Sequence, residues 1–242
     1  MPEVLTVPPG LPQKTIWNRY MVSYDYLNQL DTYREGLREL AESACIRPGL
    51  KILDAGSGTG NLTDLLRQRG ADVVSLDFSE AALRIHRVKD PEAIQIRASL
   101  EEPLPLEASS FDAICCASVL FALSKNGCVS ALSEFYRILR PGGTIVLTVA
   151  CPSKRNGNLL RKHLDSKVRK SGLRGLGSAL VEVPQLLRVL YYNRLLQRQP
   201  DWNGYHRFNE VELRTMVAHA GFSHIDVTKT YGESFFLLKA QH

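Results

Sequence analysis

The chain has 242 residues, of which 44% are hydrophobic and 23% charged, as is typical of one large globular domain or of one domain with an insertion. It contains no run of about eighteen uncharged apolar residues, which excludes a membrane-spanning helix within this sequence. The formal net charge of +5 is local, because residues 154–174 alone carry +7 and the remainder carries −2.

The first 46 residues precede the regular part of the sequence. Residues 1–14 contain four prolines and lack the basic and apolar regions of a signal peptide, so we expect an extended arm. Residues 18–46 are predicted to form a helix, because their leucines follow the helical period. A Pro-Gly pair at 48 and 49 ends it. We therefore assign 1–46 to an N-terminal arm and a lid helix.

Strands and helices then alternate. The predicted strands are 51–56, 72–78, 93–99, 111–120 and 144–150, and the predicted helices are 61–70, 79–88 and 127–140, with Ser79 as an N-cap. Such alternation predicts a doubly wound α/β fold with a parallel sheet. Its ligand-facing loops would lie at the carboxyl edge of the strands.

The alternation is interrupted at residues 152–206, a segment that reads as a helical insertion. A helix at 208–221 with Asn209 as N-cap follows, and then two strands joined by a turn near Tyr231. Two consecutive strands predict a seven-stranded, mostly parallel sheet with an antiparallel last strand. The predicted core is 47–151 and 207–242, and the insertion would cap the substrate.

The sequence "ILDAGSGTG" places Gly56, Gly58 and Gly60 at alternate positions between the first strand and the next helix. A glycine turn there lets backbone N–H groups and the helix N-terminus face a ligand. Asp77, at the end of the second strand, could accept the hydroxyls of a ribose. A tight turn without a ligand is the alternative.

NAD and S-adenosylmethionine would both suit such a site, and four features favour the second. The spacing is G-x-G-x-G, whereas dinucleotide folds carry G-x-G-x-x-G. Asp54 would oppose a pyrophosphate but suits a cationic amino-acid group. About fifty residues precede the first strand, and the antiparallel ending does not fit a second mononucleotide-binding half.

Five motifs in order, "ILDAGSGTG", "SLDFS", "SFDAI", "RILRPGG" and "AGF…FFLLKA", resemble the class I, seven-stranded S-adenosylmethionine-dependent methyltransferases. The resemblance covers residues 50–150 and 207–240. "YDYLNQL", "GTGNLT" and "FYRILRPGG" further resemble the ubiquinone and menaquinone C-methyltransferase branch. The resemblance implies S-adenosylmethionine as cofactor and S-adenosylhomocysteine as product.

The resemblance also implies roles for individual residues. Asp54, Gly56, Ser57 and Gly58 would hold the methionine end of the cofactor, and Gly60 would complete the turn. Asp77 would bind the ribose, with Phe78 beside the adenine, and Ala117 would line the sulfonium. Tyr20 and Tyr24 on the N-terminal helix would close over the cofactor carboxylate, although simple packing explains them equally well.

One position departs from the pattern. Members of this family often carry an acidic residue in the loop after the third strand, where it reaches the adenine amino group. This chain has Ser99 and Leu100 there. Leu100 could still donate its backbone N–H to the base.

Methyl transfer needs approach geometry, exclusion of water and, for some acceptors, a base. No catalytic motif is therefore required. His206, where the insertion rejoins the core, is our first candidate for a base or an acceptor-positioning group, and Tyr205 is the second. The five cysteines show no spacing that suits a metal, so we expect no metal site and a reduced, cytoplasmic setting.

The insertion bears on the acceptor. Its Leu- and Tyr-rich half favours a small lipophilic or aromatic metabolite. Its basic half, 154–174, is consistent with a solvated helix face, with a patch that binds an anionic acceptor or an anionic membrane, or with a homodimer interface. Nucleic acid is disfavoured because no RNA-binding module accompanies it. Methylation of RNA or protein, or a non-catalytic cofactor-binding scaffold, are the alternative functions.

Overall fold

The computed structural model describes residues 13–151, 184, 187–192, 194–195, 207–231 and 233–242. The predicted N-terminal arm, nearly all of the insertion and its basic segment lie outside the described residues, and so do Tyr205 and His206. The roles predicted for these parts of the chain stay predictions.

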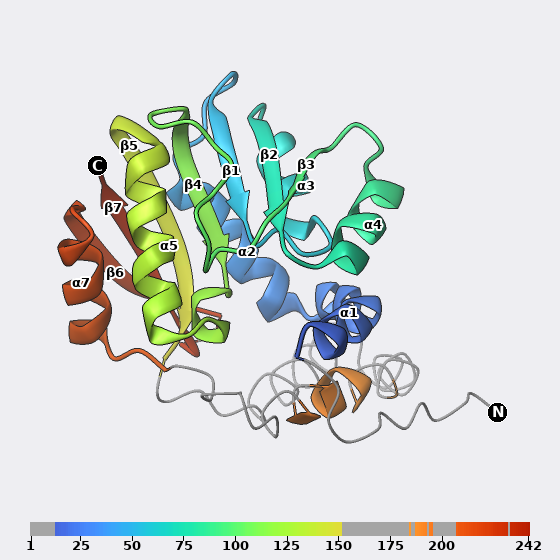
Figure 1. The fold of residues 1–242 in the computed structure, drawn as a ribbon. Coiled ribbons are helices and arrows are strands. Elements are labelled where there is room, and N and C mark those ends of the chain that lie inside the picture. Colours follow the sequence, from blue (N-terminus) through green and yellow to red (C-terminus); the bar gives the residue numbers. More distant parts are fainter. Residues whose placement is uncertain (1–12, 152–183, 185–186, 193, 196–206, 232) are drawn as a thin grey trace.

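Seven strands form one sheet in the order β3-β2-β1-β4-β5-β7-β6 (Figure 1). They are β1 (Lys51–Ala55), β2 (Asp72–Asp77), β3 (Ile94–Arg97), β4 (Phe111–Ala117), β5 (Leu139–Ala150), β6 (Ser223–Thr230) and β7 (Phe235–Gln241). Neighbours from β3 to β5 are parallel, and β7 runs antiparallel to both β5 and β6. The predicted α/β class and its antiparallel last strand are confirmed.

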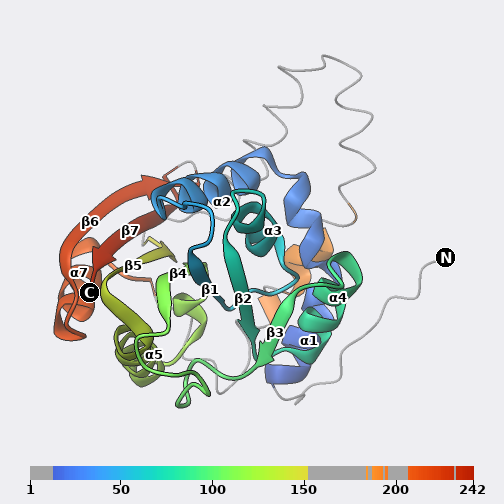
Figure 2. The same ribbon diagram turned by 90° about the horizontal axis from the view of Figure 1, so that it is seen from above.

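The helices are α1 (Gln13–Tyr24), α2 (Asp31–Ser43), α3 (Asn61–Arg67), α4 (Glu80–Lys89), α5 (Lys125–Ile138) and α7 (Glu210–His219), with short 3-10 turns η1 (Asp25–Gln29) and η2 (Leu120–Ala122). α2 and α3 cover one face of the sheet, and α5 and α7 cover the other (Figure 2). Ser79 and Asn209 cap α4 and α7 as predicted, because their side chains accept hydrogen bonds from the N–H groups of Ala82 and Glu212.

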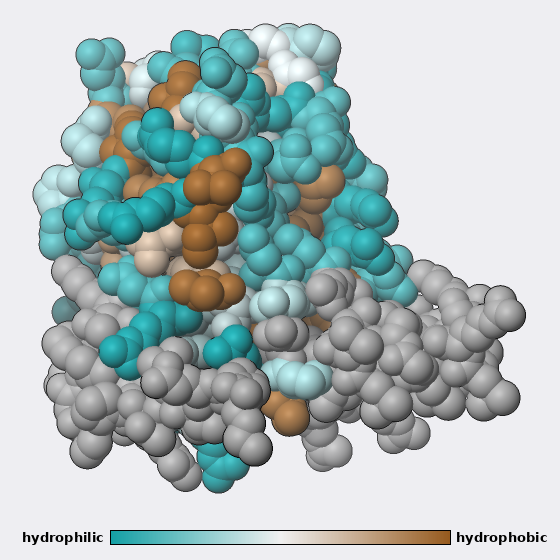
Figure 3. Space-filling model, turned by 90° about the vertical axis from the view of Figure 1, so that its right-hand side faces the viewer, coloured by the Kyte–Doolittle hydropathy of each residue, from teal (hydrophilic) through white to brown (hydrophobic). Residues whose placement is uncertain are grey.

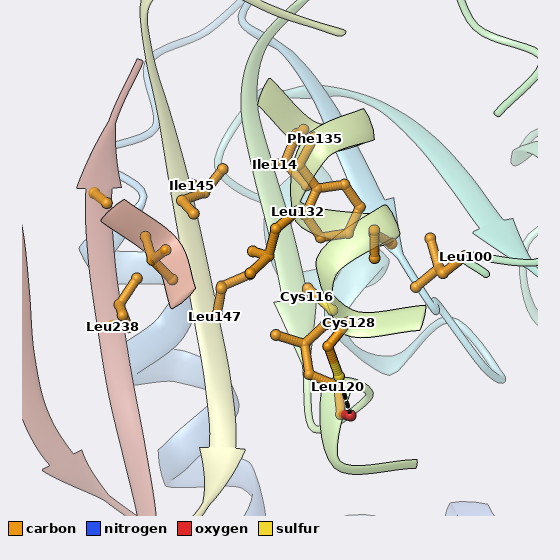
Figure 4. Close-up of a cluster of buried hydrophobic side chains, with 14 of the residues drawn as sticks. Leu100, Ile114, Cys116, Leu120, Cys128, Leu132, Phe135, Ile145, Leu147 and Leu238 are labelled. Atoms are coloured by element: carbon orange, nitrogen blue, oxygen red, sulfur yellow. Dashed lines mark hydrogen bonds between the residues drawn. The ribbon is translucent and has the colours of Figure 1, made fainter. Parts of the chain in front are cut away.

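The larger hydrophobic cluster lies between the sheet and α5 (Figure 4). Along α5, buried side chains recur at three- and four-residue spacing, for example Cys128, Leu132 and Phe135. Successive residues of β4 alternate between two clusters, since Ile114 faces α5 and Cys115 faces α2. A strand buried on both faces has no polar side, which explains the continuous apolar run in the sequence.

The single helix predicted for residues 18–46 is wrong, because η1 and Leu30 separate α1 from α2. Leu30 is extended (φ −82°, ψ 116°) and buried beneath the sheet with α2. Asp25, the first residue of η1, accepts hydrogen bonds from Thr59 and Lys89, which holds the bend in place. The leucine period continues across this break, so periodicity alone did not reveal it.

α1 lies beyond the carboxyl ends of the strands, beside the helical residues 187–192 (Figure 1). Val189 and Tyr192 pack there with Ile16 and Tyr20 of α1. The part of the insertion that is described therefore covers the edge of the sheet where ligands bind in such folds.

The side of the molecule that carries α4 is mostly hydrophilic, with a narrow band of apolar side chains (Figure 3). The exposed large apolar residues of α1, α4 and β3 are Val22, Val88 and Ile94. Among the described residues, no helix combines the length and the apolar character needed to cross a membrane.

Candidate functional site

The turn between β1 and α3 presents bare backbone. Gly56, Gly58 and Gly60 all have positive φ, at 74°, 53° and 85°. The N–H groups of Gly56 and Ser57 donate to the carbonyl of Leu76, which ties the turn to β2. A Cβ on Gly58 would meet nothing within 4 Å, so its backbone is open to an approaching ligand.

Asp54 is a buried carboxylate, and only one of its two oxygens accepts a hydrogen bond. Its Oδ2 accepts a hydrogen bond of 2.6 Å from the hydroxyl of Thr63, while Oδ1 has no partner. Burial raises the pKa of Asp54 to about 7, and the negative charge of Asp77 adds to the rise. Asp54 therefore suits a cationic group that would pair with the second oxygen.

The carboxylate of Asp77, at the end of β2, accepts hydrogen bonds from the backbone on both of its oxygens. Its Oδ2 accepts from the N–H of Gly58 and its Oδ1 from the N–H of Ser79, both at 2.8 Å. Burial raises the pKa of this carboxyl, and the backbone N–H groups of Ser79, Gly58 and Phe78 oppose the rise. A carboxylate has about four acceptor positions, so the group can still accept a hydroxyl of a ligand.

These residues open on a cavity of about 300 Å³ at the carboxyl edge of the sheet. Eleven of the predicted cofactor residues line it: Tyr20, Tyr24, Asp54, Gly56, Ser57, Gly58, Asp77, Phe78, Ser99, Leu100 and Ala117. Gly60 does not line it. A Cβ on Gly60 would meet the ring of His86, so this glycine closes the turn as the N-cap residue of α3.

The lid helix is fastened to the site by polar contacts. The hydroxyl of Ser79 donates to Asn18 of α1 at 2.7 Å. The hydroxyl of Thr59, in the glycine turn, donates to Asp25, and Lys89 pairs with the same carboxylate at 3.2 Å. The N-terminal helix is therefore held directly over the turn.

Glu101, which was not among the predicted site residues, also lines the cavity. One of its carboxylate oxygens, Oε1, accepts hydrogen bonds from the N–H and the hydroxyl of Ser124, at 2.9 and 2.7 Å. An acidic side chain is thus present in the loop after β3, one residue beyond Leu100. Allowing the loop one further residue would have found it.

A row of aromatic rings was also not predicted as a unit. It runs through Trp17, Tyr20, Tyr24, Tyr33, Tyr231 and Phe235, with successive ring centroids 5.5, 5.5, 6.2, 6.1 and 4.8 Å apart. All six side chains line the cavity. Tyr231 and Phe235 flank the turn between β6 and β7. The predicted position of this turn at the carboxyl edge of the sheet could have indicated that the two residues line the site.

Residues 53–147 match the family model described as a methyltransferase domain. A demethylmenaquinone methyltransferase of Renibacterium salmoninarum is 33% identical over 130 residues, which are 53% of this chain and 53% of the relative. A ubiquinone/menaquinone biosynthesis C-methyltransferase of Shewanella frigidimarina is 27% identical over 228 residues, which are 88% of this chain and 83% of the relative. The match thus spans about half the length of the first relative.

Solved structures agree on the fold. A methyltransferase of Thermotoga maritima, described as dependent on S-adenosylmethionine, has a TM-score of 0.63 at 19% identity. The match covers 94% of this chain and 98% of that one. At this identity the likeness concerns the fold alone.

The residues of the cavity fit S-adenosylmethionine. Its amino-acid end carries an ammonium group, and the unpartnered Oδ1 of buried Asp54 can accept it. Asp77 can still accept a ribose hydroxyl, and the open backbone of Gly58 leaves room between the two acids. Residues 53–147 thus match a methyltransferase domain, and the fold around them is similar to that of S-adenosylmethionine-dependent methyltransferases.

Proposed function

We propose that the protein transfers the methyl group of S-adenosylmethionine to a small, lipophilic or aromatic metabolite. One observation carries the proposal: the glycine turn and the aromatic row line the same cavity. The wall of the cavity combines two buried carboxylates and open backbone with aromatic rings and aliphatic side chains. A polar cofactor and an apolar acceptor would therefore meet inside it.

The charge of the cavity wall supports this class of acceptor. Among the described residues that line it, Arg207 has the only positively charged side chain, whereas Asp54, Asp77 and Glu101 are acidic. Strongly anionic acceptors would be repelled. The names of the quinone-modifying relatives are consistent with a lipophilic ring as acceptor.

The bound cofactor supplies a methyl group that its sulfonium already activates. The chain has to align the acceptor with that methyl group and to keep water out. α1 and residues 187–192 serve the second purpose, since Tyr20, Met21 and Val189 pack together over the cavity. No residue needs to form a covalent bond with the substrate.

We also propose a cytoplasmic location. The basic segment 154–174 would touch an anionic membrane surface or form a homodimer contact. RNA or protein methylation and a non-catalytic scaffold remain the rival functions. A lipophilic acceptor would itself be delivered at a membrane surface, so we place the membrane contact first.

The first test measures thermal unfolding with S-adenosylhomocysteine, S-adenosylmethionine, NADH and NADPH, each added alone. A ligand at a hundred times its Kd adds about 2.7 kcal/mol, or several degrees of Tm for a chain of this size. We expect a rise with the adenosyl compounds only. Incubation with methyl-labelled cofactor, hydroquinones, phenols, amines and bulk RNA then identifies the acceptor class. Label on RNA alone would refute the small-molecule proposal.

A further inference from the structure

Three polar side chains are buried together between α3 and the sheet. Asp54 of β1 and Ser75 of β2 are direct partners in the parallel register of these strands, and Thr63 of α3 contacts both. All three are at most 1% exposed. The side chains around them on this face of the sheet are mainly apolar, such as Leu62 and Leu66 of the same helix. Polar groups in such a place cost free energy unless hydrogen bonds compensate them.

The hydrogen bonds of these residues form a chain that ends on the carboxylate. The hydroxyl of Thr63 donates its single hydrogen to Oδ2 of Asp54 at 2.6 Å. The contact of 2.9 Å between the hydroxyls of Thr63 and Ser75 therefore has Ser75 as its donor. Successive hydrogen bonds polarise one another, so the Ser75 hydroxyl strengthens the bond from Thr63 to Asp54.

Other influences on Asp54 act against its charge. Burial is the largest of them and raises its pKa to about 7, and the charge of Asp77 adds to the rise. The thiols of Cys115 and Cys116 and the hydroxyl of Tyr24 also lie near this carboxylate. Burial raises the pKa of all three groups, so they are neutral. The hydrogen bonds from α3 are the interactions that lower the pKa of Asp54.

We propose that Thr63 and Ser75 are positioning residues for the cofactor, because they hold Asp54 ionised and correctly oriented to attract the ammonium group of S-adenosylmethionine. Asp54 lines the cavity and neither Thr63 nor Ser75 does, so both hydroxyls act through the carboxylate. The inference rests on the proposed function, since it requires S-adenosylmethionine as the ligand of the glycine turn.

The test compares S-adenosylhomocysteine with its deamino analogue, which keeps the carboxylate and lacks only the amino group. Isothermal titration calorimetry measures the affinity of the full chain for each compound at pH 7. We expect the wild type to bind S-adenosylhomocysteine at least tenfold more tightly than the analogue. Thr63→Val keeps the shape of the side chain and should reduce this ratio to about threefold or less, without weakening the binding of the analogue. Thr63→Ser restores the hydroxyl and should keep the wild-type ratio, whereas Ser75→Ala should lower it.

The pH dependence distinguishes this role from simple packing. Without the hydroxyl of Thr63, the pKa of Asp54 should rise further, so a higher pH is needed to ionise the carboxylate. Between pH 7 and pH 8.5 the ratio in Thr63→Val should therefore increase at least threefold, and by more than in the wild type. A defect in packing would leave the ratio low at both pH values, and that result would contradict the inference.

Thr230→Val is the matched control, because Thr230 is also buried and also donates to a carboxylate, that of Glu39 on α2, but does not line the cavity. It should keep the wild-type ratio. If Thr63→Val keeps the tenfold ratio, or if the wild type shows none, the inference falls and the proposed function stands. If Thr63→Val does not fold, Ser75→Ala decides by the same criterion. If neither compound binds to the wild type, the proposed function falls and takes this inference with it.

Discussion

The ring of Tyr231 lies against the bare Cα of Gly36. A Cβ built on Gly36 would be 2.5 Å from Cε2 of that ring, closer than real Cβ contacts. Gly36 is in the middle of α2, where glycine costs about 1 kcal/mol relative to alanine. The close approach of the turn between β6 and β7 explains why the helix has a glycine there.

We expect Gly36→Ala to lower the free energy of unfolding by roughly 2 kcal/mol. Overpacking costs up to about 3 kcal/mol, and the better helix propensity of alanine offsets about 1 kcal/mol of that cost. For a chain of this size the Tm should fall by roughly 4–8 °C. Thermal unfolding followed by circular dichroism would measure it.

The control for this prediction is the same substitution in a Tyr231→Ala background. With the ring removed, Gly36→Ala should be neutral or stabilising by up to about 1 kcal/mol. Equal losses in the two backgrounds would show that the contact between Gly36 and Tyr231 is not the cause.

Asp77→Asn should weaken the binding of S-adenosylhomocysteine by about 10- to 100-fold, because hydrogen bonds to a charged group contribute about 1.5–3 kcal/mol. Asparagine is a milder change than alanine, since its amide oxygen can still accept one of the N–H groups of Gly58 and Ser79, whereas alanine would leave both unpaired. Isothermal titration calorimetry measures the affinity, and circular dichroism verifies the fold.

Asp72→Asn is the matched control for Asp77→Asn, because Asp72 lies exposed at the opposite end of β2. It removes the same charge and should leave the affinity unchanged. Wild-type affinity in Asp77→Asn would mean that the ribose is bound elsewhere.

How much of this site was visible in the sequence depends on the kind of residue. The glycine turn follows β1 directly, and Asp54 and Asp77 lie at the ends of β1 and β2. Because these strands are parallel, both acids lie at the same edge of the sheet, and both line the cavity. Tyr33, Tyr231 and Phe235 come from α2 and from the far end of the chain. Their meeting depends on the antiparallel pairing of β7 and on the bend at Leu30, which no local pattern encodes.

Glu101 shows the same limit on a smaller scale. The loop after β3 has no regular structure, so its path decides which side chain reaches the cavity. In this chain Ser124, the N-cap of α5, holds the carboxylate of Glu101 from another segment. Propensities along the loop contain no information about that partner.

The buried Asp54 should make stability depend on pH. Its pKa is about 7 in the folded chain and 3.8 for the ordinary group, so the folded state binds more protons than the unfolded state between about pH 4 and 7. Its contribution to the free energy of unfolding therefore falls as pH rises through that window. Urea unfolding should be measured at pH 5, 6, 7 and 8. The free energy of unfolding of Asp54→Asn should increase relative to that of the wild type as the pH increases. Parallel curves would contradict a raised pKa.

The same carboxylate should affect cofactor binding with the opposite sign. An ammonium group near Oδ1 favours the ionised form of Asp54, so affinity for S-adenosylhomocysteine should increase from pH 6 to pH 8. Calorimetry on the wild type and on Asp54→Asn separates this effect from other titrations, because the variant should lose most of the increase. An identical pH dependence in both proteins would remove Asp54 from the methionine end of the site.

Glu101 should recognise the exocyclic amino group of the adenine. Ser124 occupies Oε1, and Oε2 remains as an acceptor beside the cavity. The wild type should bind S-adenosylhomocysteine about tenfold more tightly than S-inosylhomocysteine, in which an oxygen replaces that amino group. Glu101→Gln should reduce this preference to about threefold, because a neutral amide accepts a weaker hydrogen bond than a carboxylate. Glu102→Gln changes the adjacent, exposed acid and should keep the preference for S-adenosylhomocysteine. If Glu101→Gln keeps this preference too, the adenine is recognised by backbone groups such as the N–H of Leu100.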